Sequence, residues 1–267
     1  MMLFVSPRAW AVALTAVGVL SIPATARAQS YGTVAGQVTF AGDTVPEPEK
    51  ANVDKDQAHC LSKGPIFKNN LVVNKSNKGV RYVLVWLADA ANPKSTAWKA
   101  PIHPSLKEFK PTVEIDQPCC MFEPRVLGIR EGQALVVKNS APVAHNFSIT
   151  SIGDGPNGNW LTPSGAKGLE VSGFKAKLLP TVFSCSIHSW MKGYVGVFSH
   201  PYFTVTDEDG KFELKNVPAG KYRLMAWQEE AGWVLVNPKM RTDRGKIIEV
   251  KGNATTDVKV PLKVARD

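Results

Sequence analysis

The sequence has no apolar run long enough to cross a membrane, and it has only four cysteines and five histidines in 267 residues. The longest apolar run, Trp10–Leu20, falls well short of the about 20 residues that a transmembrane helix needs. No twin arginine precedes this run, and no lipid-attachment cysteine follows it. These absences argue against a membrane anchor, a lipoprotein and twin-arginine export.

The run instead fits the apolar centre of a secretory signal peptide. Arg8 lies before it, and Ala26 and Ala28 after it supply the small residues of a cleavage site. This pattern predicts a signal peptide over residues 1–28, with cleavage after Ala28. We therefore expect an exported protein that works in the periplasm or outside the cell.

Positive charge exceeds negative charge along the chain. The formal net charge is +9, from 32 Lys and Arg against 23 Asp and Glu, and the predicted signal peptide removes only Arg8 and Arg27. No dense basic stretch accompanies this excess, so nucleic acid is not an expected partner. Two interpretations stay open: the charge steers encounters with an acidic protein surface or anionic lipid heads, or it only keeps the protein soluble.

Helical periodicity is scarce, and short strand-like runs between Gly and Pro residues dominate. Residues 80–89 are typical of one buried strand, 125–139 of two strands about a turn at Gly132, and 145–149 of another strand. Residues 151–168 are rich in Gly, Pro, Asn and Ser and predict a long loop. This pattern predicts an all-β protein with an antiparallel sandwich architecture.

The four cysteines are Cys60, Cys119, Cys120 and Cys185. In an oxidising compartment, thiols pair unless a metal or burial protects them. Neighbouring side chains of an extended segment point to opposite faces, so only one of Cys119 and Cys120 can bridge to Cys60. We favour Cys60–Cys120, while pairing with Cys119 stays open. A second metal site from His59, Cys60 and the 119–120 pair is a further alternative.

The stretch FSCSIHSWM places a thiol, an imidazole and a thioether close together, at Cys185, His188 and Met191. Copper electron-transfer centres use two imidazoles and a thiolate, with a long bond to a thioether. A second histidine must then come from elsewhere in the chain. His145 is favoured, because it follows a predicted strand, an Asn and a short Pro-containing loop, and begins the next strand.

The segments MFEPRVLGIREGQALVVKNSAPVAHNF and FSCSIHSWM together resemble the cupredoxins, and the Cys-His-Met spacing is most similar to that of amicyanins. The resemblance implies a Greek-key β-sandwich over residues 112–202 that binds one type 1 copper ion and carries single electrons. It implies the ligands His145, Cys185, His188 and the weakly bound Met191. It also implies that Asn139 ties the two ligand-bearing loops together, and that His188 is the ligand nearest the surface.

Other copper chemistries lack their residues. No second cysteine lies near Cys185, as a binuclear centre would require, and Ser184 and Ser186 stand where multicopper oxidases have histidines. Without another metal or an open coordination position, there is no place for a substrate. We therefore expect an electron-transport protein and no enzyme.

The C-terminal part resembles a different family. TDEDGKF and VPAGKY, within residues 203–267, are similar to motifs of the carboxypeptidase-regulatory, transthyretin-like β-sandwich. The opening strand of that family resembles residues 32–43, so this strand is expected to join the C-terminal sandwich. Residues 29–111 then form an N-terminal β segment, 112–202 the cupredoxin domain and 203–267 the second sandwich.

This combination resembles bacterial exported proteins described as plastocyanin-like or methylamine-utilisation-like. Those proteins have a Cys-x-Tyr-x-Pro-His pattern where this chain reads CMFEPR, so Arg125 replaces a histidine. Two alternative functions stay open. The chain binds and delivers copper, or it is a carbohydrate-binding scaffold whose aromatic platform comes from Trp227 or Trp233.

Overall fold

The computed structural model describes residues 1–3, 29–234, 236–237 and 240–264. Residues 4–28 of the predicted signal peptide lie outside the described residues. The fold is nearly all β, as the sequence predicts: within the described part, helix is limited to α1 (Gln57–Cys60) and the 3-10 turn η1 (Pro104–Leu106). No helix among these residues is long and apolar enough to cross a membrane.

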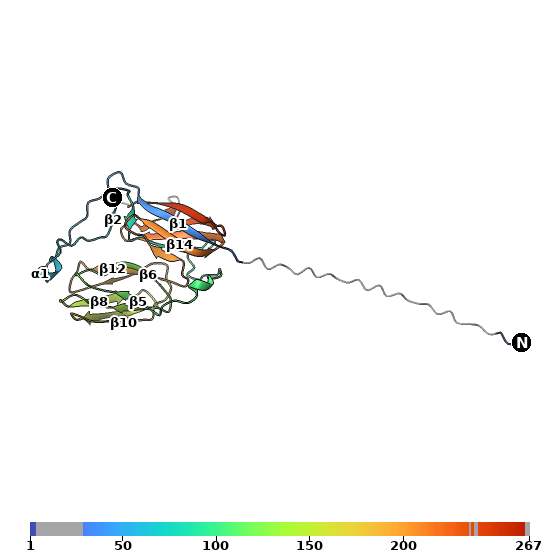
Figure 1. The fold of residues 1–267 in the computed structure, drawn as a ribbon, viewed down its shortest axis with the longest axis horizontal. Helices are drawn as coiled ribbons and strands as arrows, with labels where there is room; N and C mark the ends of the chain where they lie inside the picture. The colour runs from blue at the N-terminus through green and yellow to red at the C-terminus, as the bar shows by residue number, and fades with distance from the viewer. Residues whose placement is uncertain (4–28, 235, 238–239, 265–267) are drawn as a thin grey trace.

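Two β-sandwiches lie one above the other in Figure 1. The lower sandwich contains a sheet of order β10-β7-β5 and a sheet of order β6-β12-β11-β8-β9. Apolar side chains from both sheets, such as Leu135 and Phe183, form its core. Its strands are β5 (Thr112–Ile115), β6 (Val126–Arg130), β7 (Ala134–Val137), β8 (His145–Thr150), β9 (Asn157–Thr162), β10 (Leu169–Val171), β11 (Thr181–Ser184) and β12 (Lys192–Phe198).

The upper sandwich combines the two ends of the chain. One sheet has the order β14-β1-β20, and the other has the order β13-β4-β15-β16 with β19 paired to β15. Its strands are β1 (Tyr31–Phe40), β4 (Leu84–Asp89), β13 (Phe203–Val205), β14 (Lys211–Pro218), β15 (Gly220–Gln228), β16 (Gly232–Trp233), β19 (Lys246–Val250) and β20 (Thr255–Leu262). Strand β1 pairs with β14 and β20, the placement expected for residues 32–43. Strand β4, from the N-terminal β segment, joins this sandwich as well.

The two sandwiches share a third apolar core. Strand β4 alternates between two environments: Val85 and Leu87 face the core of the upper sandwich, whereas Leu84 and Trp86 pack with Val126 and Phe198 of the lower one. A strand with both faces buried has no polar face, which explains its continuous apolar sequence. The remaining small sheets are β2 (Val72–Val73) with β3 (Val80–Arg81), and β17 (Val236–Asn237) with β18 (Met240–Arg244).

Two expectations about strands were wrong. The run 80–89 is not one strand, because Tyr82, with a positive φ of 65°, separates β3 from β4. The expected loop 151–168 contains β9, which pairs antiparallel with β8 at the edge of the five-stranded sheet. An edge strand needs only one partner, and its outer face can remain polar, so β9 lacked an apolar signal.

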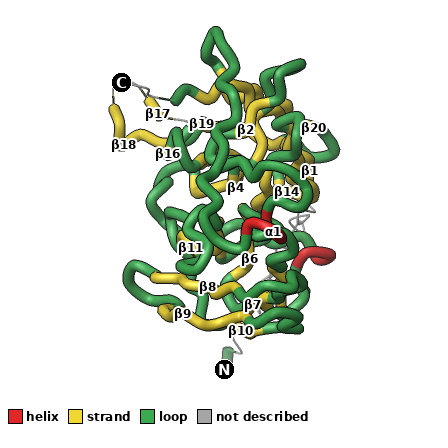
Figure 2. Tube along the Cα trace, turned by 90° about the vertical axis from the view of Figure 1, so that its left-hand side faces the viewer, coloured by secondary structure: helices red, strands yellow, loops and turns green. Residues whose placement is uncertain are grey.

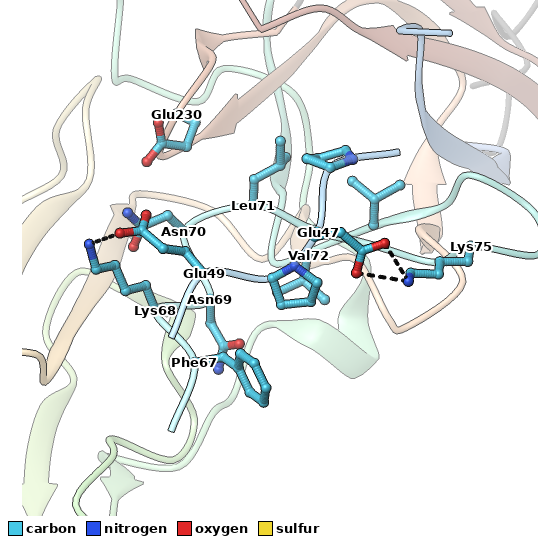
Figure 3. Close-up of a pocket in the computed structure, with 13 residues that line it drawn as sticks. Glu47, Glu49, Phe67, Lys68, Asn69, Asn70, Leu71, Val72, Lys75 and Glu230 are labelled. Carbon is cyan, nitrogen blue, oxygen red and sulfur yellow. Dashed lines mark hydrogen bonds and ion pairs between the residues drawn. The ribbon is translucent and has the colours of Figure 1, made fainter. Parts of the chain in front are cut away.

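Residues 47–68, here called the cap, leave the upper sandwich and reach the lower one. Its two arms pair through a bridge between Lys50 and Phe67, and α1 forms its tip. Figure 1 shows α1 at the side of the lower sandwich, and in Figure 2 it lies near the height of β6, below β14. A cleft of about 240 Å³ lies where the arms begin, and the ion pairs Lys68–Glu49 and Lys75–Glu47 are among the residues that line it (Figure 3).

Candidate metal centre

Three neighbouring strands of the lower sandwich bring the expected ligands together. His145 is the first residue of β8, and Cys185 directly follows β11, which pairs with β8. His188 and Met191 lie in the tight turn from β11 to β12, which also pair. In that turn, the amide of Cys185 donates to the carbonyl of Met191 at 3.0 Å, and the amide of Met191 donates to that of His188 at 2.9 Å.

The ligand atoms of His145, Cys185 and His188 converge in a buried space. The Nδ1 atoms of the two histidines are 2.8 Å apart. The Sγ atom of Cys185 lies 3.9 Å from Nδ1 of His188. All three side chains are at most 2% exposed, and Met191 is 1% exposed in the same core cluster. The structure therefore brings the three strong expected ligands together and places Met191 beside them.

The donor atoms fit a soft metal cation such as copper. At 2.8 Å one Nδ1 donates and the other accepts, so the two imidazoles hold one proton between them. The pKa of His145 is lowered to about 4, mainly by burial and to a smaller extent by the neighbouring His188. This low pKa favours the neutral ring that binds metals. Two imidazole nitrogens and a thiolate are the in-plane set of a type 1 copper site.

Asn146 ties the two ligand-bearing loops together, and the expected role of Asn139 was wrong. The side-chain oxygen of Asn146 accepts hydrogen bonds from the amides of Ser186 at 2.8 Å and Ile187 at 3.1 Å. The backbone amide of Asn146 points to Sγ of Cys185 at 3.5 Å.

Asn139 instead stabilises its own side of the site. Its amide nitrogen donates to the carbonyls of Val143 and Thr162 at 2.8 Å and of Pro163 at 3.1 Å. Its oxygen accepts from the amide of Ala141. These bonds shape the loop that precedes His145, and among the described residues none of them reaches the Cys185–Met191 turn.

His188, expected to be the ligand nearest the surface, does not itself reach solvent. Its side chain is fully buried, and its Nε2 lies 2.8 Å from Oδ2 of Asp56 in the cap. The ring of Trp190 packs against it at 5.1 Å between centroids. The indole nitrogen of Trp190 donates to the carbonyl of Cys120. The cap therefore covers the Nε2 side of this imidazole.

A disulfide joins Cys60, at the end of α1, to Cys120 of the lower sandwich, the pair favoured from the sequence. Cys119 is a free, partly exposed thiol. The sulfur atoms of the disulfide and a ring nitrogen of His188 lie within 4.8 Å of one another. Because both of these sulfurs are in the disulfide, Cys60 and Cys120 offer no thiolates to the alternative second metal site with His59.

Arg125, which stands where the similar exported proteins have a histidine, links the two sandwiches. It forms an ion pair with Glu229, which follows β15, and the two side chains are only 4% and 7% exposed. Lys192, next to Met191, pairs with the same carboxylate. Nothing in the sequence indicated this pairing, since 104 residues separate Arg125 from Glu229.

Comparison with known proteins gives partial matches. Residues 186–257 match the family model described as polysaccharide lyase family 4, domain II, which is not the carboxypeptidase-regulatory family named above. No curated protein matches the chain.

Solved structures of copper proteins resemble part of the chain. A purple cupredoxin from Nitrosopumilus maritimus is 21% identical, over 32% of this chain and 97% of that one, with a TM-score of 0.27. A mutant amicyanin in its oxidised state is 17% identical, over 34% of this chain and 86% of that one, with a TM-score of 0.28. A copper-containing nitrite reductase from Thermus scotoductus is 23% identical with a TM-score of 0.28, over 37% of this chain but only 25% of that one.

Proposed function

We propose that this protein is an exported, mononuclear type 1 copper protein that carries single electrons between redox partners. The observation that carries this proposal is the buried convergence of Nδ1 of His145, Nδ1 of His188 and Sγ of Cys185. Bound copper would supply a one-electron couple at this point. His145, Cys185 and His188 would hold it, with Met191 as the weak fourth ligand.

The chain's own residues support electron transfer more than exchange or catalysis. Two backbone amides, of Asn146 and His188, point to Sγ of Cys185 at 3.5 and 3.4 Å, where they would donate to a metal-bound thiolate. All four side chains are buried in a packed core, so their positions change little when an electron arrives or leaves. The same burial leaves no room for a substrate, so we propose no enzymatic activity.

The partner that we propose is a redox protein with an acidic surface, met in the periplasm or outside the cell. The net positive charge of the chain supports this choice, because opposite charge accelerates encounter. Raising the ionic strength should then slow electron transfer to an acidic partner.

The direct test is copper loading of the mature chain from Gln29. We expect one equivalent of Cu(II) to give an intense thiolate-to-copper band in the visible spectrum, a type 1 EPR signal and a reversible one-electron wave. Cys185→Ser should abolish the band, whereas Cys119→Ser, which changes the other free thiol, should preserve it. A colourless protein that folds normally would contradict the proposal.

A carbohydrate-binding scaffold is the second candidate, and the match of residues 186–257 to a polysaccharide lyase domain is what favours it. Trp227 does not form an exposed platform, because it is 8% exposed and packs in the core between the sandwiches. Trp233 is half-buried against Trp86. Glycan binding that persists unchanged in Cys185→Ala, without any copper band in the parent protein, would favour this candidate. If the protein instead delivers copper, the copper should exchange readily and give no reversible one-electron wave in voltammetry.

A further inference from the structure

We propose that Asp56 of the cap is a positioning residue of the metal centre, which orients His188 and favours the oxidised metal. This inference rests on the proposed copper site and goes beyond it, since it adds a carboxylate from a segment outside the lower sandwich. The observation is the contact of 2.8 Å between Oδ2 of Asp56 and Nε2 of His188.

The contact fixes which nitrogen of His188 carries a proton. A carboxylate accepts hydrogen bonds, so Nε2 of His188 donates to Asp56. The lone pair of the neutral ring is then on Nδ1, which faces His145 and Cys185. A carboxylate behind a metal-bound histidine selects the tautomer, fixes the ring orientation and makes the nitrogen a stronger donor.

The backbone of Asp56 indicates that its side chain is directed to this contact. Asp56 occupies the N-cap position of α1, where an aspartate normally accepts a hydrogen bond from the first turn, yet its side chain makes no capping bond. Its φ of 47° and ψ of 35° lie in the left-handed region, which is uncommon for a residue other than glycine. Such conformations concentrate at functional sites. Here the carboxylate stabilises His188 instead of the helix.

The cap is held firmly enough to aim this carboxylate. Its residues Val53, Cys60 and Ile66 are buried in the core of the lower sandwich. The Cys60–Cys120 disulfide fixes the other end of α1. A segment that is held in advance by packing and covalent links orients its partner at a smaller entropy cost.

The negative charge of Asp56 has a second effect. It interacts more favourably with the oxidised metal than with the reduced one, because the oxidised metal carries the larger positive charge. The carboxylate should therefore lower the reduction potential. Replacing it by an amide would keep the hydrogen bond and remove the charge, so the two effects can be separated.

The experiment compares Asp56→Asn and Asp56→Ala with the matched control Asp54→Asn, which changes another exposed carboxylate of the cap. Nitrogen-15 NMR of the histidine rings reports the tautomer of His188 in the metal-free protein. Competition titrations give the affinities for Cu(II) and Cu(I), and voltammetry gives the potential.

We expect Asp56→Ala to bind Cu(II) about 10–100-fold more weakly and to lose the single tautomer of His188. Asp56→Asn should keep the tautomer and raise the potential by about 59 mV for each tenfold preferential loss of Cu(II) affinity. The control should match the parent protein. A parent-like tautomer, affinity and potential in Asp56→Ala would overturn the inference. Absence of the copper band in the parent would instead reject the proposed function, while the NMR comparison would still test the Asp56–His188 contact.

Discussion

The side-chain oxygen of Asn146 lies 3.1 Å from the sulfur of Cys185, although the two residues are 39 positions apart. The same oxygen accepts the amides of Ser186 and Ile187, so one side chain holds the loop that follows the proposed thiolate ligand. This relationship links β8, which carries His145, to the turn after β11. It makes Asn146 the side chain on which the mutual position of the two ligand-bearing segments depends.

Asn146→Ala should lower the free energy of unfolding of the metal-free protein by about 1–3 kcal/mol, because two amides near the core lose their acceptor. It should also weaken and broaden the thiolate-to-copper band, since the Cys185 loop loses its anchor. Urea denaturation and visible spectroscopy measure these effects. Asn159→Ala is the control, because it removes only the exposed partner of Asn146. An unchanged spectrum in Asn146→Ala would contradict the role given to it.

Asn139→Ala should separate stability from the metal site. The variant loses a buried amide that donates to three carbonyls, so it should also unfold at a lower urea concentration. The shape of its copper spectrum should match that of the parent, because none of those bonds reaches the Cys185 turn. If Asn139→Ala changed the band and Asn146→Ala did not, the two roles would have to be exchanged.

Removing the disulfide should loosen the cap. The double variant Cys60→Ser/Cys120→Ser should lose about 2–5 kcal/mol of stability, because the bond closes a loop with a sequence separation of 60. It should also release copper to a chelator faster than the parent does, since α1 is no longer tied over His188. Stopped-flow chelator competition measures the release, with Cys119→Ser as the control. Equal release rates would show that packing alone holds the cap in place.

Arg125→Met should destabilise the junction of the two sandwiches by about 3–5 kcal/mol, because Glu229 is only 7% exposed and loses a buried partner. Lys192 still pairs with that carboxylate, so the lower end of the range is expected. Adding Glu229→Gln to Arg125→Met should recover part of the loss, as no buried negative charge then remains. Denaturation curves of the single and double variants test this, and a double variant that is less stable than the single one would contradict it.

His200 should make stability depend on pH. Burial, followed by the positive charge of Arg130, lowers its pKa from 6.5 to about 3, and its Nδ1 accepts the amide of Tyr202 at 3.1 Å. At a pH between about 3 and 6.5, His200 is therefore protonated in the unfolded chain but neutral in the folded protein. Stability is therefore lost as the pH falls from about 6.5 toward 3, by at most about 1.4 kcal/mol per pH unit for this group.

His200→Asn keeps an acceptor for that amide but does not titrate. Its loss of stability between pH 7 and pH 4.5, measured by urea denaturation, should be smaller than that of the parent. Groups that titrate in both proteins, such as His145, contribute equally to both pH dependences, so their effect cancels in the difference. Identical pH dependence in the two proteins would show that His200 is not held neutral.

The ligands of the proposed site could be predicted because three of them lie on one short loop. Cys185, His188 and Met191 are so close in sequence that any tight turn brings them together, and their residue types suit copper. The all-β fold could be predicted from strand-like runs and frequent turn residues. For the disulfide, the sequence left two candidate partners of Cys60, the neighbours Cys119 and Cys120. Adjacent side chains of an extended segment face opposite ways, so only one of them can pair, but this rule does not say which one.

The sequence alone thus determined the fold class and the residue types of the proposed metal site, because both depend on local pattern and residue type. Tertiary structure decided what surrounds the donors. Asp56 lies 132 residues from His188, and Arg125 lies 104 residues from Glu229, so no local pattern indicates either contact. Such contacts form only when the two sandwiches pack against each other and the cap folds over the site. The burial of His188 under the cap is therefore a property of the folded molecule and not of any segment of its sequence.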